Sequence, residues 1–308
     1  MNEAKPVKKL LIIIVPAYNE EEMIQATVSS LKAGGEKLED LGIESKVYVI
    51  DDGSRDGTGE AALEAGVDRL LRHKVNLGLG AAIRTGLKSA REDKADIVVK
   101  FDADLQHDPG DIPALISPIL EDEADVVYGN RFEHIEYRMP FIRRIGNWFF
   151  IRLMRFLTGW PIQDSQPGIF AVNKDYLEVF NIPGDYNYTQ QVLLDAYHKG
   201  MRFAQVPVRF KPRVSGKSFV SLKYPFKVGY QILLVLASIA PMRIFAPFGL
   251  LSILIGFLIF AFELVLFFIG RTAKPVLHVN AVLGALVLGL QTFFFGLLAE
   301  LIVRNQKK

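Results

Sequence analysis

Cysteine is absent from this 308-residue chain, which excludes a disulfide framework, a thiolate metal site and a cysteine nucleophile. The five histidines are scattered and show no HExxH spacing, which argues against a zinc hydrolase. A strong excess of either charge is also missing, because 36 Lys and Arg against 34 Asp and Glu leave a formal net charge of +2. Bulk attraction to a polyanion is therefore not expected, and no nucleic acid partner is predicted.

The length and the apolarity indicate a folded chain of about two units, at roughly 150 residues per domain. Half of the residues are hydrophobic, and the mean hydropathy is +0.21, too apolar for a disordered or fibrous chain. Near the N-terminus, the apolar run Leu10–Val15 stops at Pro16. It is too short for a signal peptide or a membrane span, so a buried strand is expected there.

Charge is nearly missing from the C-terminal part of the chain. Glu263 is the only charged residue in Ile244–Ile269, and Val276–Leu298 has none. A helix needs about 20 apolar residues to cross a bilayer core, so two transmembrane helices are predicted, joined by a turn at Gly270–Pro275. Inside a span Glu263 is costly, and we expect it to face another helix or another subunit; a homo-oligomer is left open.

The residues around the two spans predict their orientation. Four basic residues lie near the start of the first span and after the end of the second: Arg243, Arg304, Lys307 and Lys308. Two lie in the turn that joins the spans, Arg271 and Lys274. The positive-inside rule therefore places both termini and the preceding domain in the cytoplasm. Ahead of the spans, Phe219–Ala240 mixes lysines with aromatic and apolar residues. This pattern is typical of helices in a membrane interface, and an ordinary surface helix is the alternative.

Strand-like and helix-like segments alternate in the first 130 residues. Strands are expected at 10–15, 45–50, 69–71, 97–101 and 126–129, and helices at 20–38, 56–65, 80–90 and 113–120. The alternation predicts an α/β fold with a mostly parallel sheet covered on both faces. Ligands of such sheets bind beyond the carboxyl ends of the strands. Polar motifs follow three of these ends: Pro16–Glu20, Asp51–Ser54 and Asp102–Asp104.

The third motif predicts a metal site. Asp102 and Asp104 are two carboxylates directly after a buried strand, and Gln106 adds a further oxygen. Mg²⁺ and Mn²⁺ prefer such hard ligands, and Mg²⁺ is typically held by one or two carboxylates together with substrate phosphates. A solvated acidic loop is the alternative interpretation.

The other two motifs are candidate nucleotide contacts. The carboxylate of Asp52 could accept hydrogen bonds from a base or a ribose, and Tyr18 could contact either. Each position also has a structural explanation, since Gly53 suits a tight turn and Glu20 suits a helix start. The run Asn76–Gly80 could bring backbone N–H groups to a diphosphate, and a plain helix entry explains it equally well.

Cations for phosphate binding follow later in the chain. Arg131 comes after a predicted strand, Arg143 and Arg144 are adjacent, and Arg213 and Lys217 lie in the sequence RVSGKS. A guanidinium binds phosphate oxygens in a bidentate manner. For Arg143 and Arg144, contact with anionic lipids is the alternative.

Taken together, the motifs resemble those of glycosyltransferase family 2, and most closely its polyprenyl-phosphate branch, which includes the dolichyl-phosphate mannose synthases. The residues that carry the resemblance are Val15–Glu20, Val49–Thr58, Asn76–Leu87, Phe101–Pro109, Tyr128–Arg131, Asp164–Phe170 and Val206–Ser218. Two positions depart from the pattern. Phe219 stands where the family often has the Lys of GxSK, and Pro167 stands where DxxSGF has Ser.

The resemblance implies a GT-A-type fold and a set of roles. The donor nucleotide would be lined by Pro16, Tyr18, Glu20, Ile50, Asp52 and Ala103. The metal would be held by Asp102, Asp104 and Gln106, and the acceptor phosphate by Arg131, Arg143 and Lys217. Arg131 and Arg213 would act in catalysis together with Asp102 and Asp104. The implied domains are 1–218 (catalytic), 219–243 (interface helices), 244–303 (two spans) and 304–308 (cytoplasmic tail).

The resemblance also implies a reaction, in which a hexose passes from a nucleotide-sugar to a polyprenyl phosphate in the bilayer. The second pKa of a phosphate monoester is about 6, so a general base is less necessary than for a hydroxyl acceptor. One displacement with inversion, assisted by Mg²⁺ or Mn²⁺, is expected. A membrane enzyme that extends a polysaccharide and a non-catalytic adaptor of the same fold are the alternatives. The sequence leaves GDP-mannose and UDP-glucose both open as donors.

Overall fold

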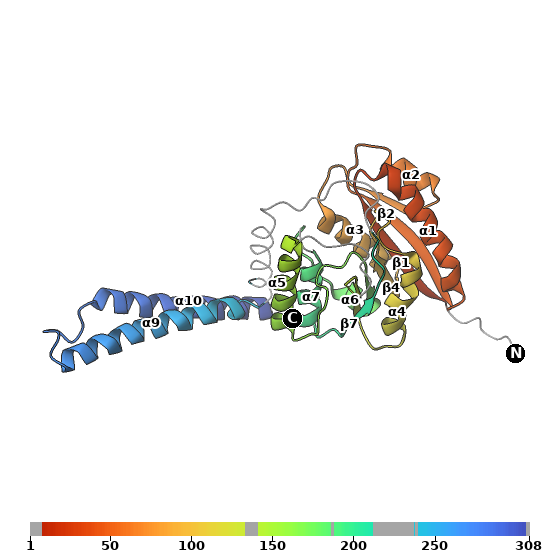
Figure 1. Ribbon diagram of the computed structural model, residues 1–308. Coiled ribbons are helices and arrows are strands. Elements are labelled where there is room, and N and C mark those ends of the chain that lie inside the picture. Colours follow the sequence, from red (N-terminus) through yellow and green to blue (C-terminus); the bar gives the residue numbers. More distant parts are fainter. Residues whose placement is uncertain (1–7, 133–140, 186–187, 212–236, 238–239, 306–308) are drawn as a thin grey trace. The chain divides into compact units, whose positions relative to one another are not determined.

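The computed structural model describes residues 8–132, 141–185, 188–211, 237 and 240–305. The chain divides into two units, Met1–Val228 and Gly229–Lys308 (Figure 1). The predicted catalytic boundary at residue 218 and most of the predicted interface segment 219–243 fall outside the described residues.

A seven-stranded sheet forms the centre of the first unit. Its strands are β1 (Lys9–Ala17), β2 (Ile43–Asp51), β3 (Arg69–Arg72), β4 (Ile97–Lys100), β5 (Val126–Asn130), β6 (Phe170–Asn173) and β7 (Phe203–Pro207). The helices are α1 (Glu21–Glu39), α2 (Thr58–Glu64), α3 (Leu79–Glu92), the short 3-10 helix η1 (Pro109–Asp111), α4 (Ile112–Leu120), α5 (Phe141–Thr158), α6 (Lys174–Val179) and α7 (Tyr188–His198). Every element predicted in the first 130 residues is present, with ends shifted by at most two residues.

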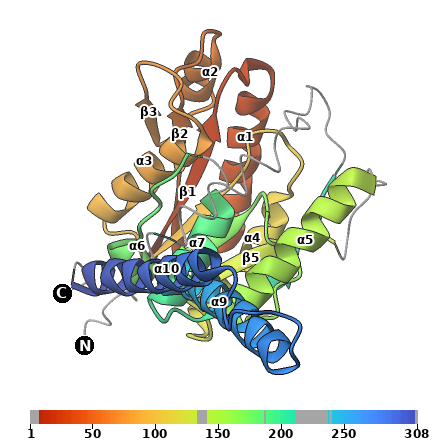
Figure 2. The ribbon, with the colours of Figure 1, turned by 90° about the vertical axis from the view of Figure 1, so that its left-hand side faces the viewer.

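The strand order is β3-β2-β1-β4-β6-β5-β7. Figure 2 shows β3, β2 and β1 next to one another. Strands β3, β2, β1 and β4 are parallel, and β5 is parallel to β7. Strand β6 runs antiparallel to both of its neighbours, β4 and β5. The predicted mostly parallel sheet is therefore confirmed, and the antiparallel strand was not foreseen.

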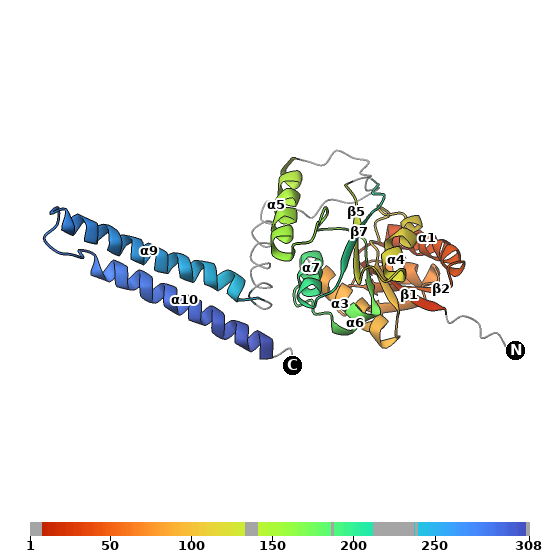
Figure 3. The same cartoon turned by 90° about the horizontal axis from the view of Figure 1, so that it is seen from below.

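Helices cover both faces of the sheet. Ile24 of α1 and Leu115 of α4 share one buried cluster with Ile13 of β1, so these helices cover the same face. Helix α3 covers the other face (Figure 3). Its Gly86 allows close contact with Ile14 of β1. Neighbouring side chains of β1 thus enter two different cores, which explains why its sequence is a continuous apolar run.

The second unit is a hairpin of two long helices, α9 (Met242–Phe268) and α10 (Val279–Asn305). Their most apolar segments have mean hydropathies of 2.7 and 2.1, and both helices are long enough to cross a membrane. Only 11% and 17% of the residues in these segments are buried, so they do not resemble the core helices of a soluble protein. The connection, residues 269–278, is longer than the predicted turn.

The two helices of the hairpin pack closely at glycines. A Cβ atom added to Gly289 would lie 2.6 Å from the carbonyl oxygen of Gly249 and 2.8 Å from the backbone nitrogen of Ile253. Nearby, the Ser252 hydroxyl donates a hydrogen bond to the Ala285 carbonyl at 2.9 Å. Small residues that let backbones approach are typical of helix contacts in membranes.

Glu263 lies at the tip of this hairpin and is buried. Its carboxylate accepts hydrogen bonds from the backbone N–H groups of Leu277, at 2.8 Å, and His278, at 3.2 Å. It also contacts Nδ1 of His278 at 2.5 Å. The described partners of Glu263 are thus the last two residues of the connection, directly before α10.

Candidate active site

The carboxyl ends of β1 and β2 bring the first two motifs together. Pro16 is paired with Ile50 in the parallel ladder, and Ala17 with Asp51. The next residue, Asp52, donates its N–H to the Ala17 carbonyl at 2.9 Å. The predicted nucleotide residues of these strands therefore lie along one edge of the sheet.

The turns that follow the two strands interlock. Asn19 has a positive φ of 54°, and its side chain accepts a hydrogen bond from the Arg55 N–H at 2.9 Å. The N–H of Glu20 donates to the Thr58 hydroxyl at 2.9 Å, just before α1 begins. Tyr18 is left 38% exposed at this edge, where its ring is available to a ligand.

Asp52 holds a neighbouring loop in place. The carboxylate is buried and accepts hydrogen bonds from the N–H groups of Leu77, at 2.9 Å, and Gly78, at 2.8 Å. It also contacts Nδ1 of His73 at 2.7 Å. The predicted contact of Asp52 with a base or ribose stays a prediction, and these hydrogen bonds show in addition that Asp52 places the loop before α3.

The glycine run before α3 lets this part of the backbone lie close to residues 184–185. A Cβ atom added to Gly80 would lie 2.6 Å from the Gly184 carbonyl oxygen. The N–H of Gly80 donates to the Asp185 carbonyl at 3.0 Å, and the Arg84 side chain pairs with the Asp185 carboxylate. Helix entry and packing against residues 184–185 thus account for this run.

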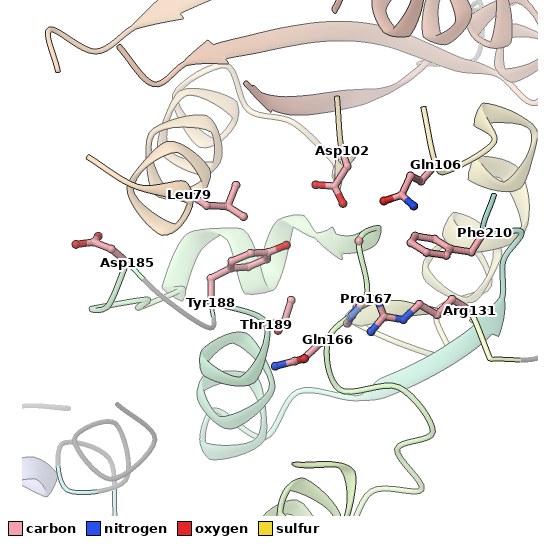
Figure 4. Close-up of a pocket in the computed structure, with 11 residues that line it drawn as sticks. Leu79, Asp102, Gln106, Arg131, Gln166, Pro167, Asp185, Tyr188, Thr189 and Phe210 are labelled. Carbon is pink, nitrogen blue, oxygen red and sulfur yellow. The ribbon is translucent and has the colours of Figure 1, made fainter. Parts of the chain in front are cut away.

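A cavity of about 360 Å³ lies beyond the end of β4 (Figure 4). It is lined by Leu79, Asp102, Gln106, Arg131, Gln166, Pro167, Gly168, Asp185, Tyr188, Thr189 and Phe210. Asp102 and Gln106 lie on one side, and Arg131 lies opposite (Figure 4). The cavity therefore has a carboxylate and a guanidinium on facing walls.

Asp102 is paired with a buried cation. The ammonium of Lys100, the last residue of β4, is fully buried and forms an ion pair with Oδ1 of Asp102. It also donates to the Gly168 carbonyl at 2.7 Å and lies 5.4 Å from the ring centroid of Tyr188. Burial alone would lower the pKa of Lys100, but the Asp102 carboxylate outweighs it and the pKa is raised. Lys100 is therefore charged at neutral pH.

The loop after Asp102 presents oxygen atoms. Oδ1 of Asp104 accepts a hydrogen bond from the N–H of Gln106 at 3.2 Å, and the Gln106 side chain donates to the Lys211 carbonyl at 3.0 Å. Between the two acids, Ala103 is buried, and its carbonyl accepts a bond from the Thr27 hydroxyl at 3.0 Å. The loop is thus fixed from both sides.

This donor set fits a hard divalent cation. Asp102, Asp104 and Gln106 supply carboxylate and amide oxygens, the ligands that Mg²⁺ and Mn²⁺ prefer. Within the described residues, no group of three or more His, Asp and Glu side chains gathers as a metal site. A metal at this loop would therefore take its remaining ligands from a substrate or from water.

His107 lies buried next to two residues of the cavity wall, Phe210 and Gly168. It is 4% exposed and packs between the rings of Phe101 and Phe210, at centroid distances of 6.1 and 5.0 Å. Burial lowers the pKa of His107 to about 4, so the ring is neutral at physiological pH. A Cβ atom added to Gly168 would lie 2.2 Å from Nε2 of His107 and 2.5 Å from Oδ2 of Asp102. Only a glycine fits there without displacement.

Arg131 is held on its wall by a buried acid. Its Nε atom lies 3.0 Å from Oδ2 of Asp164, which is 1% exposed. The guanidinium also lies 5.6 Å from the ring centroid of Phe210. The side chain of Gln205 in β7 fixes the loop of Asp164, accepting a bond from the Gln163 N–H and donating one to the Asp164 carbonyl, at 2.5 and 2.7 Å.

Comparison with known proteins decides the family. The model for glycosyl transferase family 2 matches residues 12–180, more than half of the chain. This chain belongs to glycosyltransferase family 2. It is an enzyme that transfers a sugar, as the sequence motifs predicted.

Two relatives and one solved structure illustrate the similarity. The chain is 30% identical to the UDP-N-acetylglucosamine–dolichyl-phosphate N-acetylglucosaminyltransferase of Methanococcus voltae, over 74% of this chain and 96% of the relative. It is 29% identical to the undecaprenyl-phosphate mannosyltransferase of Micrococcus luteus, over 68% and 87%. The glucosyl-3-phosphoglycerate synthase of Mycobacterium tuberculosis, solved with Mn²⁺, UDP and glucosyl-3-phosphoglycerate, matches with a TM-score of 0.58 at 22% identity, over 75% of this chain and 79% of that one. This likeness supports the predicted GT-A-type fold.

Some predicted residues of this glycosyltransferase cannot be placed in the site. Arg213 and Lys217 fall in residues 212–236, outside the described residues. Arg143 is in the first turn of α5, but its side chain is also outside the described part. Of the predicted phosphate-binding cations, the structure places Arg131 at the cavity.

Several residues in and around the cavity were not predicted from the sequence. Lys100 could have been singled out from the sequence, because it is the one charged residue in the apolar strand sequence IVVKF. Asp164 was noted only as part of a motif. Gln166 belongs to the same motif, whereas Tyr188 and Thr189 lie in a stretch without a strand end or a motif in the sequence. Tertiary packing of β6 and α7 against β4 and β5 brings them to the cavity.

Proposed function

We propose that this glycosyltransferase transfers a hexose from a nucleotide-sugar of the GDP-mannose or UDP-glucose type to a polyprenyl phosphate. The observation that carries the proposal is the cavity in which Asp102 and Gln106 face Arg131 (Figure 4). One wall suits a diphosphate that arrives with a divalent cation, and the other suits a second phosphate. A reaction between two phosphate-bearing substrates needs such a pair of walls.

The acceptor is inferred from the relatives and from apolar surface. The named relatives act on dolichyl phosphate and undecaprenyl phosphate. Helix α5 exposes Trp148, Phe149 and Phe156, which are 59%, 54% and 85% accessible. Arg152 lies over the Trp148 ring at 5.2 Å. Exposed aromatic and basic side chains on one helix favour contact with a lipid interface.

A lipid acceptor also accounts for the hairpin. Removing a polyprenyl chain from the bilayer costs about 0.8 kcal/mol per CH₂, so the enzyme must come to the membrane. Helices α9 and α10 are long and apolar enough to hold it there. The excess of basic residues outside their connection favours a cytoplasmic catalytic unit and two spans.

The donor nucleotide is assigned to the edge of β1 and β2. Pro16, Tyr18 and Glu20 would contact the base and ribose together with Ile50, and Asp52 would act by holding the loop at Leu77 and Gly78. Ala103, between the two acids, would lie beside the diphosphate. The hexose would then project from this edge into the cavity.

The chemistry proposed is one displacement with inversion. A phosphate oxygen of the acceptor forms a bond to the anomeric carbon, and the bond from that carbon to the diphosphate oxygen breaks. Most of the acceptor phosphate is already ionised at neutral pH, so no protein base is needed. Arg131, fixed by Asp164, holds and orients the acceptor, with Arg143, Arg213 and Lys217 as further cations.

Asp102, Asp104 and Gln106 would hold Mg²⁺ or Mn²⁺, which supplies Lewis acidity toward the departing diphosphate when bound. The chain's own contribution is to orient these oxygens. Lys100 fixes Asp102, and the Gln106 N–H fixes Asp104.

The experiment follows transfer of radiolabelled sugar from GDP-mannose and UDP-glucose into an organic-extractable lipid by the full-length protein in polyprenyl phosphate vesicles. We expect label in the lipid, with the anomeric configuration inverted by NMR. Asp104→Asn should reduce the rate by about a hundredfold or more, the scale of losing one electrostatic group at a reacting centre. Label in a water-soluble polymer, or an unchanged rate in the variant, would contradict the proposal.

A further inference from the structure

Lys100 is the most unusual charged group in the described part of the enzyme. It ends the central strand β4 and has no exposed surface. A buried ammonium is costly unless it is paired and hydrogen-bonded, and an apolar residue would suit the middle of the sheet better. The free-energy cost of burying this ammonium points to a function beyond folding.

The partners of Lys100 all belong to the cavity. Its ammonium contacts Oδ1 of Asp102, the carbonyl of Gly168 and the face of Tyr188. Each of these three residues lines the cavity wall. Lys100 therefore joins the acidic loop, the loop before β6 and the start of α7 from beneath, without entering the cavity itself.

We propose that Lys100 is a positioning residue that makes metal binding at Asp102 depend on the nucleotide. The inference rests on the function proposed above. Asp102 and Asp104 carry two negative charges, and Lys100 cancels one of them at Oδ1 of Asp102. A free divalent cation therefore meets a local charge of only minus one. The diphosphate supplies the missing negative charge, so metal and nucleotide bind together and leave together.

Coulomb's law gives the size of the effect. A unit charge about 6 Å from a divalent ion changes its affinity by about tenfold even with the screening of bulk water. Without the ammonium, the pair of acids should hold the cation more tightly in the absence of nucleotide. A gain of affinity separates this role from a structural one, since damage to the loop would weaken binding.

The test measures Mn²⁺ binding to the full-length protein in detergent by electron paramagnetic resonance, alone and with UDP or GDP. We expect the wild type to bind Mn²⁺ weakly alone and much more tightly with one of the nucleotides. Lys100→Met should bind Mn²⁺ alone about tenfold more tightly, with a correspondingly smaller gain from the nucleotide. Lys46→Met is the matched control, because Lys46 is 41% exposed and pairs with Glu44 at the surface, and it should match the wild type.

Lys100→Gln provides a second variant, because it removes the charge but keeps hydrogen-bond donors for Asp102 and Gly168. It should also bind Mn²⁺ more tightly than the wild type, and its thermal unfolding reports whether it folds. If either folded variant binds free Mn²⁺ no more tightly while the wild type binds it with nucleotide, the role of Lys100 is wrong and the proposed function stands. If the wild type takes up no Mn²⁺ even with nucleotide, the metal site and this inference both fail.

Discussion

Gly168 shows how the absence of one side chain shapes the cavity. A Cβ atom there would collide with Nε2 of His107 and Oδ2 of Asp102, both held by their surroundings. We expect Gly168→Ala to displace Asp102 and reduce sugar transfer by about a hundredfold, the scale of a small misplacement at a reacting centre. Gly146→Ala in α5 is the control, because an added Cβ meets nothing within 4 Å, and its rate should be unchanged. Equal rates for the two variants would show that the cavity tolerates the extra atom.

Asp125 gives a pH-dependent contribution to stability. Burial would raise its pKa, but hydrogen bonds from Arg202 outweigh this and the pKa is lowered. The contribution is therefore present above the unfolded pKa of about 3.9 and is lost as the pH falls through the lower folded pKa. Asp125→Asn should lower the free energy of unfolding by about 1–3 kcal/mol near pH 7, and the difference should shrink toward pH 3.

The control for Asp125 is Asp122→Asn. Asp122 also pairs with Arg202, but its side chain is 89% exposed, so an effect near zero is expected. Thermal unfolding of both variants from pH 3 to 7 checks the prediction. A loss of stability in Asp125→Asn that stays constant across this range would contradict it.

Single residues could be placed from the sequence where they follow a strand. Tyr18, Asp52 and Asp102 all lie at the predicted edge, because parallel strands end together. Their partners could not be predicted. Asp52 binds a loop 25 residues away in sequence, and Arg131 binds Asp164, 33 residues away. Such pairs depend on how loops fold over the sheet, which no local pattern encodes.

At the scale of elements, the sequence pattern predicted the first five strands of the sheet and not the last two, β6 and β7. The alternation of strand and helix up to Asn130 follows one simple rule of parallel sheets. Strand β6 breaks that rule by entering antiparallel between β4 and β5. Its place in the sheet is decided by pairing with β4 and β5, which are distant in sequence, and no local pattern encodes that pairing.

The hairpin gives a prediction on helix packing. Gly289→Leu should force α9 and α10 apart, because backbone atoms of Gly249 and Ile253 lie within 2.8 Å of the new Cβ. We expect a loss of about 1–3 kcal/mol, seen as a lower melting temperature in detergent. Gly284→Leu adds the same side chain to α10 where nothing lies within 4 Å, so it should melt like the wild type. Matching melting temperatures for both variants would mean that the glycine contact is not needed.

At the scale of the whole molecule, the absence of cysteine allows the membrane orientation to be tested directly. Single cysteines at Ala273, in the connection of the hairpin, and at Glu64, in α2, would both be exposed. In intact cells, a membrane-impermeant maleimide should label A273C and leave E64C unlabelled. In permeabilised cells, both variants should be labelled. Labelling of E64C in intact cells would reverse the proposed orientation.

The contact of Glu263 with the start of α10 has a mechanical consequence. Because this carboxylate binds the last two residues of the connection, it holds the end of α9 next to the entry to α10. Together with the close contact of Gly249 and Gly289, it joins the two helices at two separate levels of the hairpin. We expect α9 and α10 to enter a bilayer, and to tilt within it, as one rigid unit.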